Sequence, residues 1–519
     1  MWSSVSFAQV AAALAVVALT RVLVPFLHDV RRKMRIAKGL APLPGPKGRC
    51  LLGLLPEIKK NIDTIYDFQE SLMVQYGGRI KLPWDLFSNG SVYITSAEDV
   101  KHILTTNFNN YIKAEPLLAT FSDLFGKSFF GLNHAHSADN GAMWKLQRQV
   151  ASKVFTTNNF KIFSEQIFHK YALKMVEIVD LQDGKCNILE IASQYTLQAI
   201  FDVGCGVPLT EVDERLGLSF VESLSFVASN IADRFFVKPY FRTFWWCMPS
   251  EWRLKREAKV MTNIADKILA RRLKESDEEL ATKFDIMSLF IKKARELDDN
   301  ECSSVLDVET LRSIFLTIIA AGWDTTSSTI TYTCYCLIQY PETQDKLLQE
   351  LEELNKSQLT YDDVKKLKYL DAVVSESMRL YPTVPIDRKE AAEDDYLPDG
   401  TFIPAGTEVL YSPWYMGRHS PIWGDDPKVF RPERWLEMKT HPSVYEFPAF
   451  QAGPRICIGM NMALLEAKMF IAVMVRNFHV QIQEGEQLKN RGYTLTPTLT
   501  MKGGLPLQMT PREQVARPY

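Results

Sequence analysis

Cysteine and histidine are scarce in this chain. Its 519 residues contain eight cysteines and eight histidines. The cysteines are scattered, without the paired spacing of a zinc site or the density of a disulfide framework, so we expect a reducing compartment. A basic excess is also missing, since the formal net charge is −2, and this argues against nucleic acid as a partner. With 46% hydrophobic and 24% charged residues, the composition is that of a globular protein.

A long apolar run occurs near the N-terminus. Residues 7–27 are mostly apolar, although Thr20 and Arg21 interrupt them, and a helix of about 20 residues crosses a bilayer. No basic residue precedes this run and five follow it: Arg31, Arg32, Lys33, Arg35 and Lys38. That asymmetry favours an uncleaved anchor over a secretory signal peptide and keeps the rest of the chain cytoplasmic. We therefore predict a membrane anchor at 1–28, then a basic stop segment and proline-rich hinge at 29–48.

The stretch from Phe450 to Gly459, Phe-Gln-Ala-Gly-Pro-Arg-Ile-Cys-Ile-Gly, places one cysteine in a turn before a helix-forming run. Cys457 lies at the positive end of the helix dipole, which favours its thiolate. Gly453 permits the turn, and Gly459 lets the backbone approach a flat ligand closely. Backbone N–H groups after Cys457 can point at its sulfur, and Arg455 can face a carboxylate. The pattern indicates an axial thiolate on a haem iron, with Arg455 on a haem propionate.

A lone cysteine is more often a small buried hydrophobe. Here five positions agree at fixed spacing, namely Phe450, Gly453, Arg455, Cys457 and Gly459. The stretch resembles the haem-binding loop of cytochromes P450, Phe-x-x-Gly-x-Arg-x-Cys-x-Gly. The resemblance covers essentially residues 42–512 and implies the P450 fold, which is mainly α with a small β-rich lobe. The haem domain would then span 49–519, behind a single N-terminal transmembrane helix.

A long helix is predicted from Asp307 to Tyr340, ended by Pro341. Its middle, residues 320–326, reads Ala-Ala-Gly-Trp-Asp-Thr-Thr. A glycine beside hydroxyl residues is a place where the hydrogen-bond ladder of a helix can open and admit water or a ligand. Polar groups inside an apolar helix also need partners, so a purely structural role would be costly.

This stretch resembles the P450 motif Ala/Gly-Gly-x-Asp/Glu-Thr on the oxygen side of the haem. Ala321, Gly322, Asp324 and Thr325 match it. By that resemblance Ala321 lines the substrate pocket, Thr325 hydrogen-bonds dioxygen, and Asp324 connects a proton relay to solvent. Asp324 and Thr325 are therefore the predicted catalytic residues.

Further haem contacts follow from the resemblance. Trp144 and Arg148 lie at i and i+4, on one face of a predicted helix; an isolated pair indicates ordinary packing, but in P450s such a pair holds a propionate. Arg388 or Lys389 is a candidate for the second propionate, at the end of a predicted strand at 383–389. The same segment supplies expected pocket residues: Val384, Pro385 and Ile386.

A buried ion network is also implied. Glu376 and Arg379 lie one helical turn apart, a spacing that is common on solvated surfaces. The segment Pro-Glu-Arg-Trp that contains Arg434 resembles the Pro-Glu-Arg-Phe segment of P450s, where the arginine joins that pair. Such a network stabilises only if every charge is partnered.

Other features are less specific. Short strands are predicted at Ile80–Leu82 and Ser91–Ile94. His134 and His136 lie in a long irregular segment and are expected to be solvated. Residues 235–252 are rich in aromatic and basic side chains, which indicates either core or a surface that dips into a membrane.

Softer likenesses point within the family to the fatty-acid ω-hydroxylase group of plants and fungi. They occur at residues 384–389, 394–401, 417–418, 423–426, 432–436 and 501–505. They imply a haem b monooxygenase that inserts one oxygen atom of O2 into an aliphatic C–H bond of a long-chain fatty acid, or of an alkane or fatty alcohol. Without a flavin or Rossmann region, its electrons would come from NADPH–cytochrome P450 reductase. The expected location is the endoplasmic reticulum membrane, in contact with lipid, as a single-pass protein with a cytoplasmic catalytic domain.

Two other classes are considered. P450-like hydroperoxide isomerases and lyases need neither dioxygen nor a reductase, and they characteristically lose the acid–alcohol pair that Asp324 and Thr325 retain here. A non-catalytic haem carrier would have no use for a proton relay.

Overall fold

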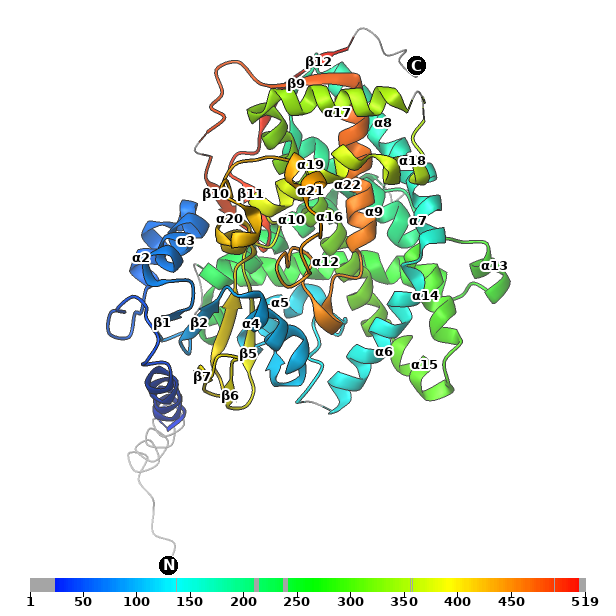
Figure 1. Cartoon of the computed structure of the whole chain (residues 1–519). Helices are drawn as coiled ribbons and strands as arrows, with labels where there is room; N and C mark the ends of the chain where they lie inside the picture. The colour runs from blue at the N-terminus through cyan, green and yellow to red at the C-terminus, as the bar shows by residue number, and fades with distance from the viewer. Residues whose placement is uncertain are drawn as a thin grey trace, which may run out of the picture.

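The computed structural model describes residues 24–136, 138–209, 214–236, 241–354, 356, 358–489 and 491–512. Long helices make up most of the molecule, and a smaller lobe with β-sheet lies at the lower left of Figure 1. The predicted mainly α fold with a small β-rich lobe is thus confirmed. Most of the anchor predicted at 1–28 lies outside the described residues, and no described helix has the length and apolar character to cross a membrane.

Helices form the body of the molecule. Besides a helix at residues 24–39, the α-helices are α2 (Leu55–Lys60), α3 (Ile65–Tyr76), α4 (Ala97–Lys101), α5 (Glu115–Phe125), α6 (Ala138–Val154), α7 (Thr157–Phe163), α8 (His169–Leu181), α9 (Ile188–Cys205), α10 (Glu214–Phe236), α11 (Phe241–Phe244), α12 (Pro249–Arg272), α13 (Asp277–Ala281), α14 (Ile286–Arg295), α15 (Asp299–Val305), α16 (Val308–Gln339), α17 (Pro341–Glu353), α18 (Tyr361–Lys366), α19 (Lys368–Leu380), α20 (Pro413–His419), α21 (Glu433–Glu437) and α22 (Met460–Asn477).

The strands are short. They are β1 (Ile80–Leu82), β2 (Ser91–Ile94), β3 (Tyr111–Ile112), β4 (Lys185–Asn187), β5 (Asp387–Ala391), β6 (Asp395–Tyr396), β7 (Phe402–Ile403), β8 (Glu408–Tyr411), β9 (Phe478–Ile482), β10 (Tyr493–Leu495), β11 (Leu499–Met501) and β12 (Pro506–Pro511). The main sheet has the order β1-β2-β8-β5-β3, in which only β2 and β8 run parallel. The predicted strands at 80–82 and 91–94 are confirmed as β1 and β2, whereas the strand predicted from 383 begins later, at β5.

The helix α16 crosses the middle of the helical body (Figure 1). The side chain of Asp307 caps it by accepting a hydrogen bond from the N–H of Thr310, and it ends where Pro341 opens α17. The predicted helix at 307–340 is therefore confirmed. A Cβ at Gly322 would lie 2.6 Å from Cδ1 of Ile200 on α9, so the missing side chain at this position lets α16 and α9 pack closely.

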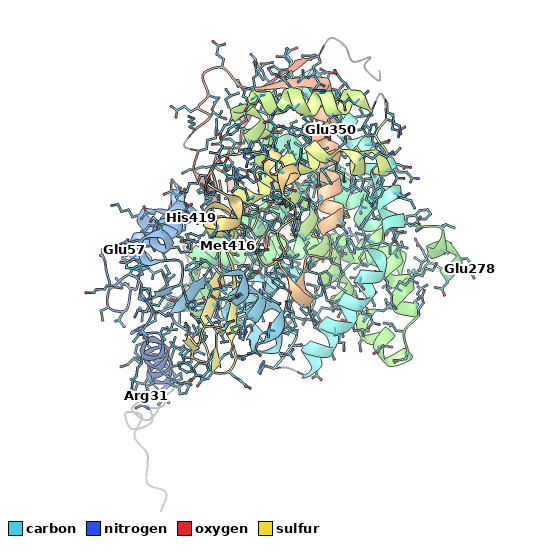
Figure 2. The ribbon with its side chains drawn as sticks, in the orientation of Figure 1. Arg31, Glu57, Glu278, Glu350, Met416 and His419 are labelled. Atoms are coloured by element: carbon cyan, nitrogen blue, oxygen red, sulfur yellow. The ribbon has the colours of Figure 1, made fainter. Side chains whose placement is uncertain are left out.

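The helix at residues 24–39 packs against the sheet lobe. Ile36 is completely buried there, in one cluster with Val92 and Val409 of the main sheet. The Nζ of Lys33 donates to the backbone carbonyl of Asp85 across 2.8 Å. Arg31 lies at the margin of the molecule in Figure 2. Part of the predicted stop segment is therefore docked on the domain.

Candidate active site

The loop before α22 brings Cys457 to the start of that helix. The backbone N–H of Cys457 donates to the carbonyl of Phe450 across 2.9 Å, which closes the loop. Gly453 has a φ of 64°, and a Cβ added there would lie 2.0 Å from the carbonyl oxygen of Leu104. A side chain at Gly453 would therefore strain the backbone and displace the neighbouring segment.

The thiol of Cys457 is both accessible and partly desolvated. The side chain is accessible to solvent, yet burial raises the pKa of its thiol. Backbone N–H groups of Gly459 and Met460 hydrogen-bond to the sulfur, and with the guanidinium of Arg148 they oppose this rise. The thiolate expected from the helix dipole is thus not favoured in the protein alone, because desolvation outweighs the dipole. A metal cation on the sulfur would reverse the balance.

Two small residues, one just before α22 and one within α16, also border open space. A Cβ added at Gly459 would lie 4.0 Å from Cε1 of Phe155 and would meet no nearer atom among the described residues. Ala321 is exposed in the middle of α16, although Ile319 and Trp323 on either side are buried. A flat ligand could therefore lie against the backbone at both positions.

Arg455 lies in the loop that carries Cys457, and Arg148 reaches that loop from α6. Neither has an acidic partner among the described residues. Arg148 Nη2 donates to the carbonyl of Ile456 across 2.8 Å, and Arg455 Nε donates to Nδ1 of His134 across 3.1 Å. Burial lowers the pKa of Arg455 to about 9 and also lowers the pKa of Arg148. The indole N–H of Trp144 is buried and has no acceptor in the part of the chain that the structure describes. Among the described residues, the partners of these two arginines are backbone carbonyls and His134, and no carboxylate pairs with either of them.

Lys113 and His134 are site residues that sequence reasoning missed. Lys113 is 6% exposed and donates to the carbonyl of Phe130, and burial holds the pKa of its ammonium well below the usual range. The prediction of a solvated histidine is wrong for His134, which stacks on Phe108 with ring centres 3.7 Å apart. Burial lowers the pKa of His134 to about 4. No pattern in the sequence distinguishes Lys113 from a surface lysine, because its burial is a tertiary property.

Comparison with known proteins identifies the family of this chain. The sequence pattern of the family described as Cytochrome P450 matches residues 43–503. The chain belongs to the cytochrome P450 family. Cytochrome P450 704B1 of Arabidopsis thaliana is 30% identical over 90% of this chain and 95% of its own length. Cytochrome P450 94A1 of Vicia sativa is also 30% identical, over 90% of this chain and 91% of its own length. Cytochrome P450 704C1 of Pinus taeda is 31% identical, over 81% of this chain and 85% of its own length. These plant relatives agree with the resemblance to the plant and fungal group.

The cofactor of this family is a haem whose iron is held by a cysteine thiolate, and the residues of this P450 fit it. Cys457 offers an accessible sulfur beside open space. Buried cations are costly unless anions meet them. Among the described residues, no anion pairs with the buried Lys113 or with the partly buried Arg148 and Arg455. Two haem propionates would supply the missing negative charge, together with an acceptor for the N–H of Trp144.

Lys389 and Arg388, the two candidates for the second propionate, are already paired. Lys389 Nζ lies 3.1 Å from Oδ2 of Asp387, and Arg388 Nη1 lies 3.3 Å from Oε2 of Glu408. Burial acts to raise the pKa of the Asp387 carboxyl. The charge of Lys389 and a hydrogen bond from the Tyr411 hydroxyl outweigh this effect, so the pKa is lowered. Lys113 is therefore better suited than Lys389 to meet an added carboxylate.

The predicted catalytic pair lies on α16. Thr325 Oγ1 donates to the carbonyl of Ala321 across 2.6 Å, and α16 remains continuous there, so the expected opening of the helical ladder is not present. The lone pairs of the Thr325 hydroxyl can still accept a hydrogen bond. Burial raises the pKa of the Asp324 carboxyl, which accepts a hydrogen bond from Thr498 that opposes the rise.

The three residues expected to line the pocket differ in exposure. Val384 is 37% exposed. Pro385 is buried, and its carbonyl accepts a hydrogen bond from Ser412 Oγ across 3.2 Å. Ile386 is partly buried against the core. Of these residues, Val384 has the most side-chain surface to offer a substrate.

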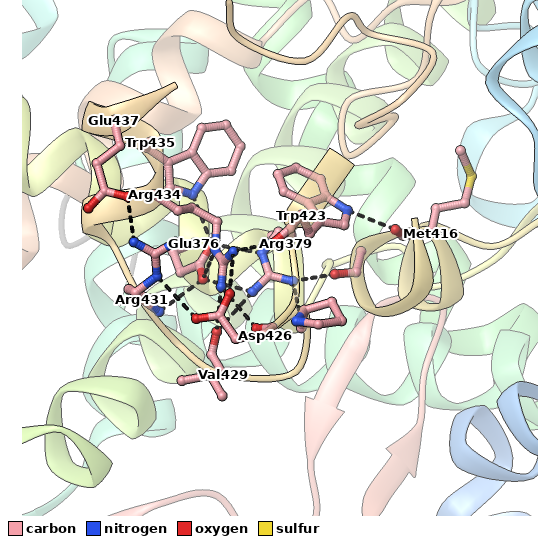
Figure 3. A network of polar contacts seen from close by, with 12 residues as sticks. Glu376, Arg379, Met416, Trp423, Asp426, Val429, Arg431, Arg434, Trp435 and Glu437 are labelled. Atoms are coloured by element: carbon pink, nitrogen blue, oxygen red, sulfur yellow. Dashed lines mark hydrogen bonds and ion pairs between the residues drawn. The ribbon is translucent and has the colours of Figure 1, made fainter. Parts of the chain in front are cut away.

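The structure brings Glu376, Arg379 and Arg434 together in one buried network (Figure 3). Glu376 Oε1 lies 2.7 Å from Arg379 Nη2 and 2.9 Å from Arg434 Nε. The indole N–H of Trp435 donates to Oε2 of the same carboxylate across 2.9 Å. Arg434 also pairs with a second carboxylate, since its Nη1 lies 3.0 Å from Oδ1 of Asp426. Every charge of the network therefore has a partner.

Proposed function

We propose that this P450 hydroxylates long-chain fatty acids at or near the methyl end. The observation that carries the proposal is the acid–alcohol pair on α16, next to the exposed Ala321. Asp324 has a carboxyl whose pKa burial raises, and Thr325 presents a hydroxyl beside it. A carboxyl that holds its proton more readily, adjacent to a hydroxyl, suits controlled proton delivery.

The haem, bound through the Cys457 thiolate, supplies the activation of dioxygen and the transfer of one oxygen atom. Trp144, Arg148, Arg455 and Lys113 would orient it through its propionates. Thr325 would hold a hydrogen bond on the oxygen side, and Asp324 would move protons to that side from solvent. Electrons come from NADPH–cytochrome P450 reductase, the usual partner of the family.

The fatty-acid substrate rests on the sequence segments that resemble the ω-hydroxylase group. The small apolar side chains of Ala321 and Val384 suit a hydrocarbon chain. Alkanes and fatty alcohols share that chain and are the second candidate substrates. The Asp324–Thr325 pair argues against hydroperoxide isomerases and lyases, which characteristically lack it.

We also infer that the protein is a single-pass protein of the endoplasmic reticulum membrane. The apolar run at 7–27, mostly outside the described residues, would be the anchor. A second contact is supported by four exposed aromatic side chains, those of Phe244, Trp245, Trp246 and Trp252, at 48%, 43%, 61% and 55%. Lys255 lies 3.4 Å from the ring centre of Trp245. Aromatic rings mixed with cations suit the headgroup region of a bilayer.

The test is a panel of long-chain fatty acids, alkanes and fatty alcohols, each incubated with the protein, the reductase and NADPH. We expect hydroxylated fatty acids by mass spectrometry, with the hydroxyl at or near the methyl end. Products from alkanes alone would instead support the second candidate. Conversion of fatty-acid hydroperoxides without NADPH would indicate an isomerase or lyase.

A further inference from the structure

Asp324 is held by a residue from the far end of the chain. Thr498 lies 174 positions later, in the turn between β10 and β11, and its hydroxyl donates a hydrogen bond to Oδ2 of Asp324. Thr498 is only 7% exposed. Among the described residues, no charged side chain forms a hydrogen bond or ion pair with this carboxyl, and its environment is set by burial and by Thr498.

Neighbouring residues hold this turn in place independently of the Thr498 hydroxyl. The hydroxyl of Ser328 donates to the carbonyl of Leu499. The N–H of Leu499 donates to the carbonyl of Thr383 across 2.8 Å. Because both contacts use the backbone of residue 499, the side chain of Thr498 can be changed without releasing the hairpin.

We propose that Thr498 is a positioning residue for the proton-carrying carboxyl of Asp324, which makes the β10–β11 hairpin part of the proton-delivery site. This inference rests on the proposed function. A hydroxyl can donate to a carboxylate and accept from a protonated carboxyl, so Thr498 can satisfy Asp324 before and after a proton moves. A lysine or arginine partner would instead hold Asp324 in the ionised state. Thr498 therefore fixes the orientation of the acid while leaving its proton mobile.

The first test is infrared absorption of the full-length haem protein, without substrate or reductase. The C=O band of protonated Asp324 is identified by its loss in Asp324→Asn. Thr498→Val removes the hydroxyl at nearly constant shape and should shift this band. It should also raise the pH at which the band disappears by about one unit, because a hydrogen bond to the carboxylate is lost. Thr498→Ser should restore both values. Thr494→Val, at an exposed position of β10, should change neither.

The second test is turnover with the reductase. Thr498→Val should form product about fivefold more slowly, the equivalent of one lost hydrogen bond, and Thr498→Ser should match the parent. The double variant Asp324→Asn/Thr498→Val should be no slower than Asp324→Asn alone, because both changes remove one function. Additive losses, or a Thr498→Val protein with an unchanged carboxyl band, would overturn the proposal.

The two tests also separate this inference from the identity of the substrate. If no fatty acid is hydroxylated, the infrared band still reports the contact between Thr498 and Asp324. NADPH oxidation and hydrogen peroxide release without substrate then report proton delivery. An intact reduced carbon monoxide spectrum in each variant shows that the haem site is retained.

Discussion

Arg434 Nε donates a hydrogen bond to Oε1 of Glu376 across 2.9 Å, and the two side chains, 58 positions apart, are buried. Arg379 shares the same carboxylate from within α19. Glu376 thus joins α19 to α21 by charge. Removing one member of a buried ion network leaves charge without its partner, which costs far more than breaking a pair at the surface.

We expect Arg434→Leu to lower the free energy of unfolding by about 3–5 kcal/mol and to reduce the haem content of the purified protein. Denaturant unfolding and the haem absorbance per protein measure the two effects. Arg431→Leu is the matched control, because Arg431 pairs with Asp426 and Glu437 at partly exposed positions and should cost about 1 kcal/mol or less. Equal losses in both variants would contradict a special role for the buried network.

Cys457→Ala should abolish the thiolate-type Soret band of the reduced carbon monoxide complex, because no sulfur then reaches the iron. The measurement is the difference spectrum of the purified protein. Cys50→Ala, which removes another exposed thiol, should leave the band unchanged. Survival of the band in Cys457→Ala would exclude Cys457 as the ligand.

Thr325→Ala should still bind haem and substrate and consume NADPH, but it should divert electrons to hydrogen peroxide, because the hydroxyl that guides proton transfer is gone. Asp324→Asn should mainly slow turnover, since it removes the proton carrier. Peroxide and product per NADPH measure both effects. Thr331→Ala is the control, because Thr331 makes the same type of bond to the helix backbone, to Ser327 at 2.8 Å, deeper in the core. A fully coupled Thr325→Ala would refute the assigned role.

Deleting residues 1–28 should release much of the protein from microsomes and leave haem binding intact. Lys33 and Ile36, which dock the remainder of the helix at 24–39 on the domain, are retained. Sedimentation and the carbon monoxide spectrum measure these outcomes. Partial retention is expected from the exposed Trp245 and Trp246, and alanines at both positions should remove it. Loss of the folded haem protein would show that the deleted segment belongs to the core.

Lys113→Met should have opposite effects on the protein with and without haem. Without haem, it removes a buried cation that has no anionic partner, so the free energy of unfolding should rise. With haem, it removes a propionate contact, so haem transfer to apomyoglobin should be about tenfold faster. Lys113→Arg should lie closer to the parent in both measurements. Faster unfolding without any change in haem transfer would contradict the assignment.

The same lysine predicts a pH dependence. Burial lowers the pKa of Lys113, so between that lowered value and about 10.4 the folded haem-free protein binds fewer protons than the unfolded chain. Its stability should therefore rise with pH through this window. Lys113→Met should show a smaller slope, measured as the unfolding free energy at successive pH values.

Local patterns in the sequence determined most of the framework. Asp307 and Pro341 delimit α16 because a cap and a proline act on adjacent residues. The spacing around Cys457 identified the thiolate loop, because the turn, the sulfur and the helix start lie within ten consecutive residues. Glu376 and Arg434 were brought together by resemblance to a family and by no local rule, since they belong to separate helices.

Only the tertiary structure determines which charged side chains are paired and which pKa values are shifted. In the sequence, Lys389 is a candidate cation for a propionate, yet in the structure it is paired with Asp387. Lys113 is buried and donates to a backbone carbonyl, with no carboxylate partner among the described residues. The pKa of the Cys457 thiol is raised, against the expectation from the helix dipole, because desolvation depends on everything that surrounds the sulfur. The contact of Thr498 with Asp324 likewise joins distant segments. Hydrogen bonds along a helix follow sequence spacing, but burial and long-range pairing depend on how the whole chain packs.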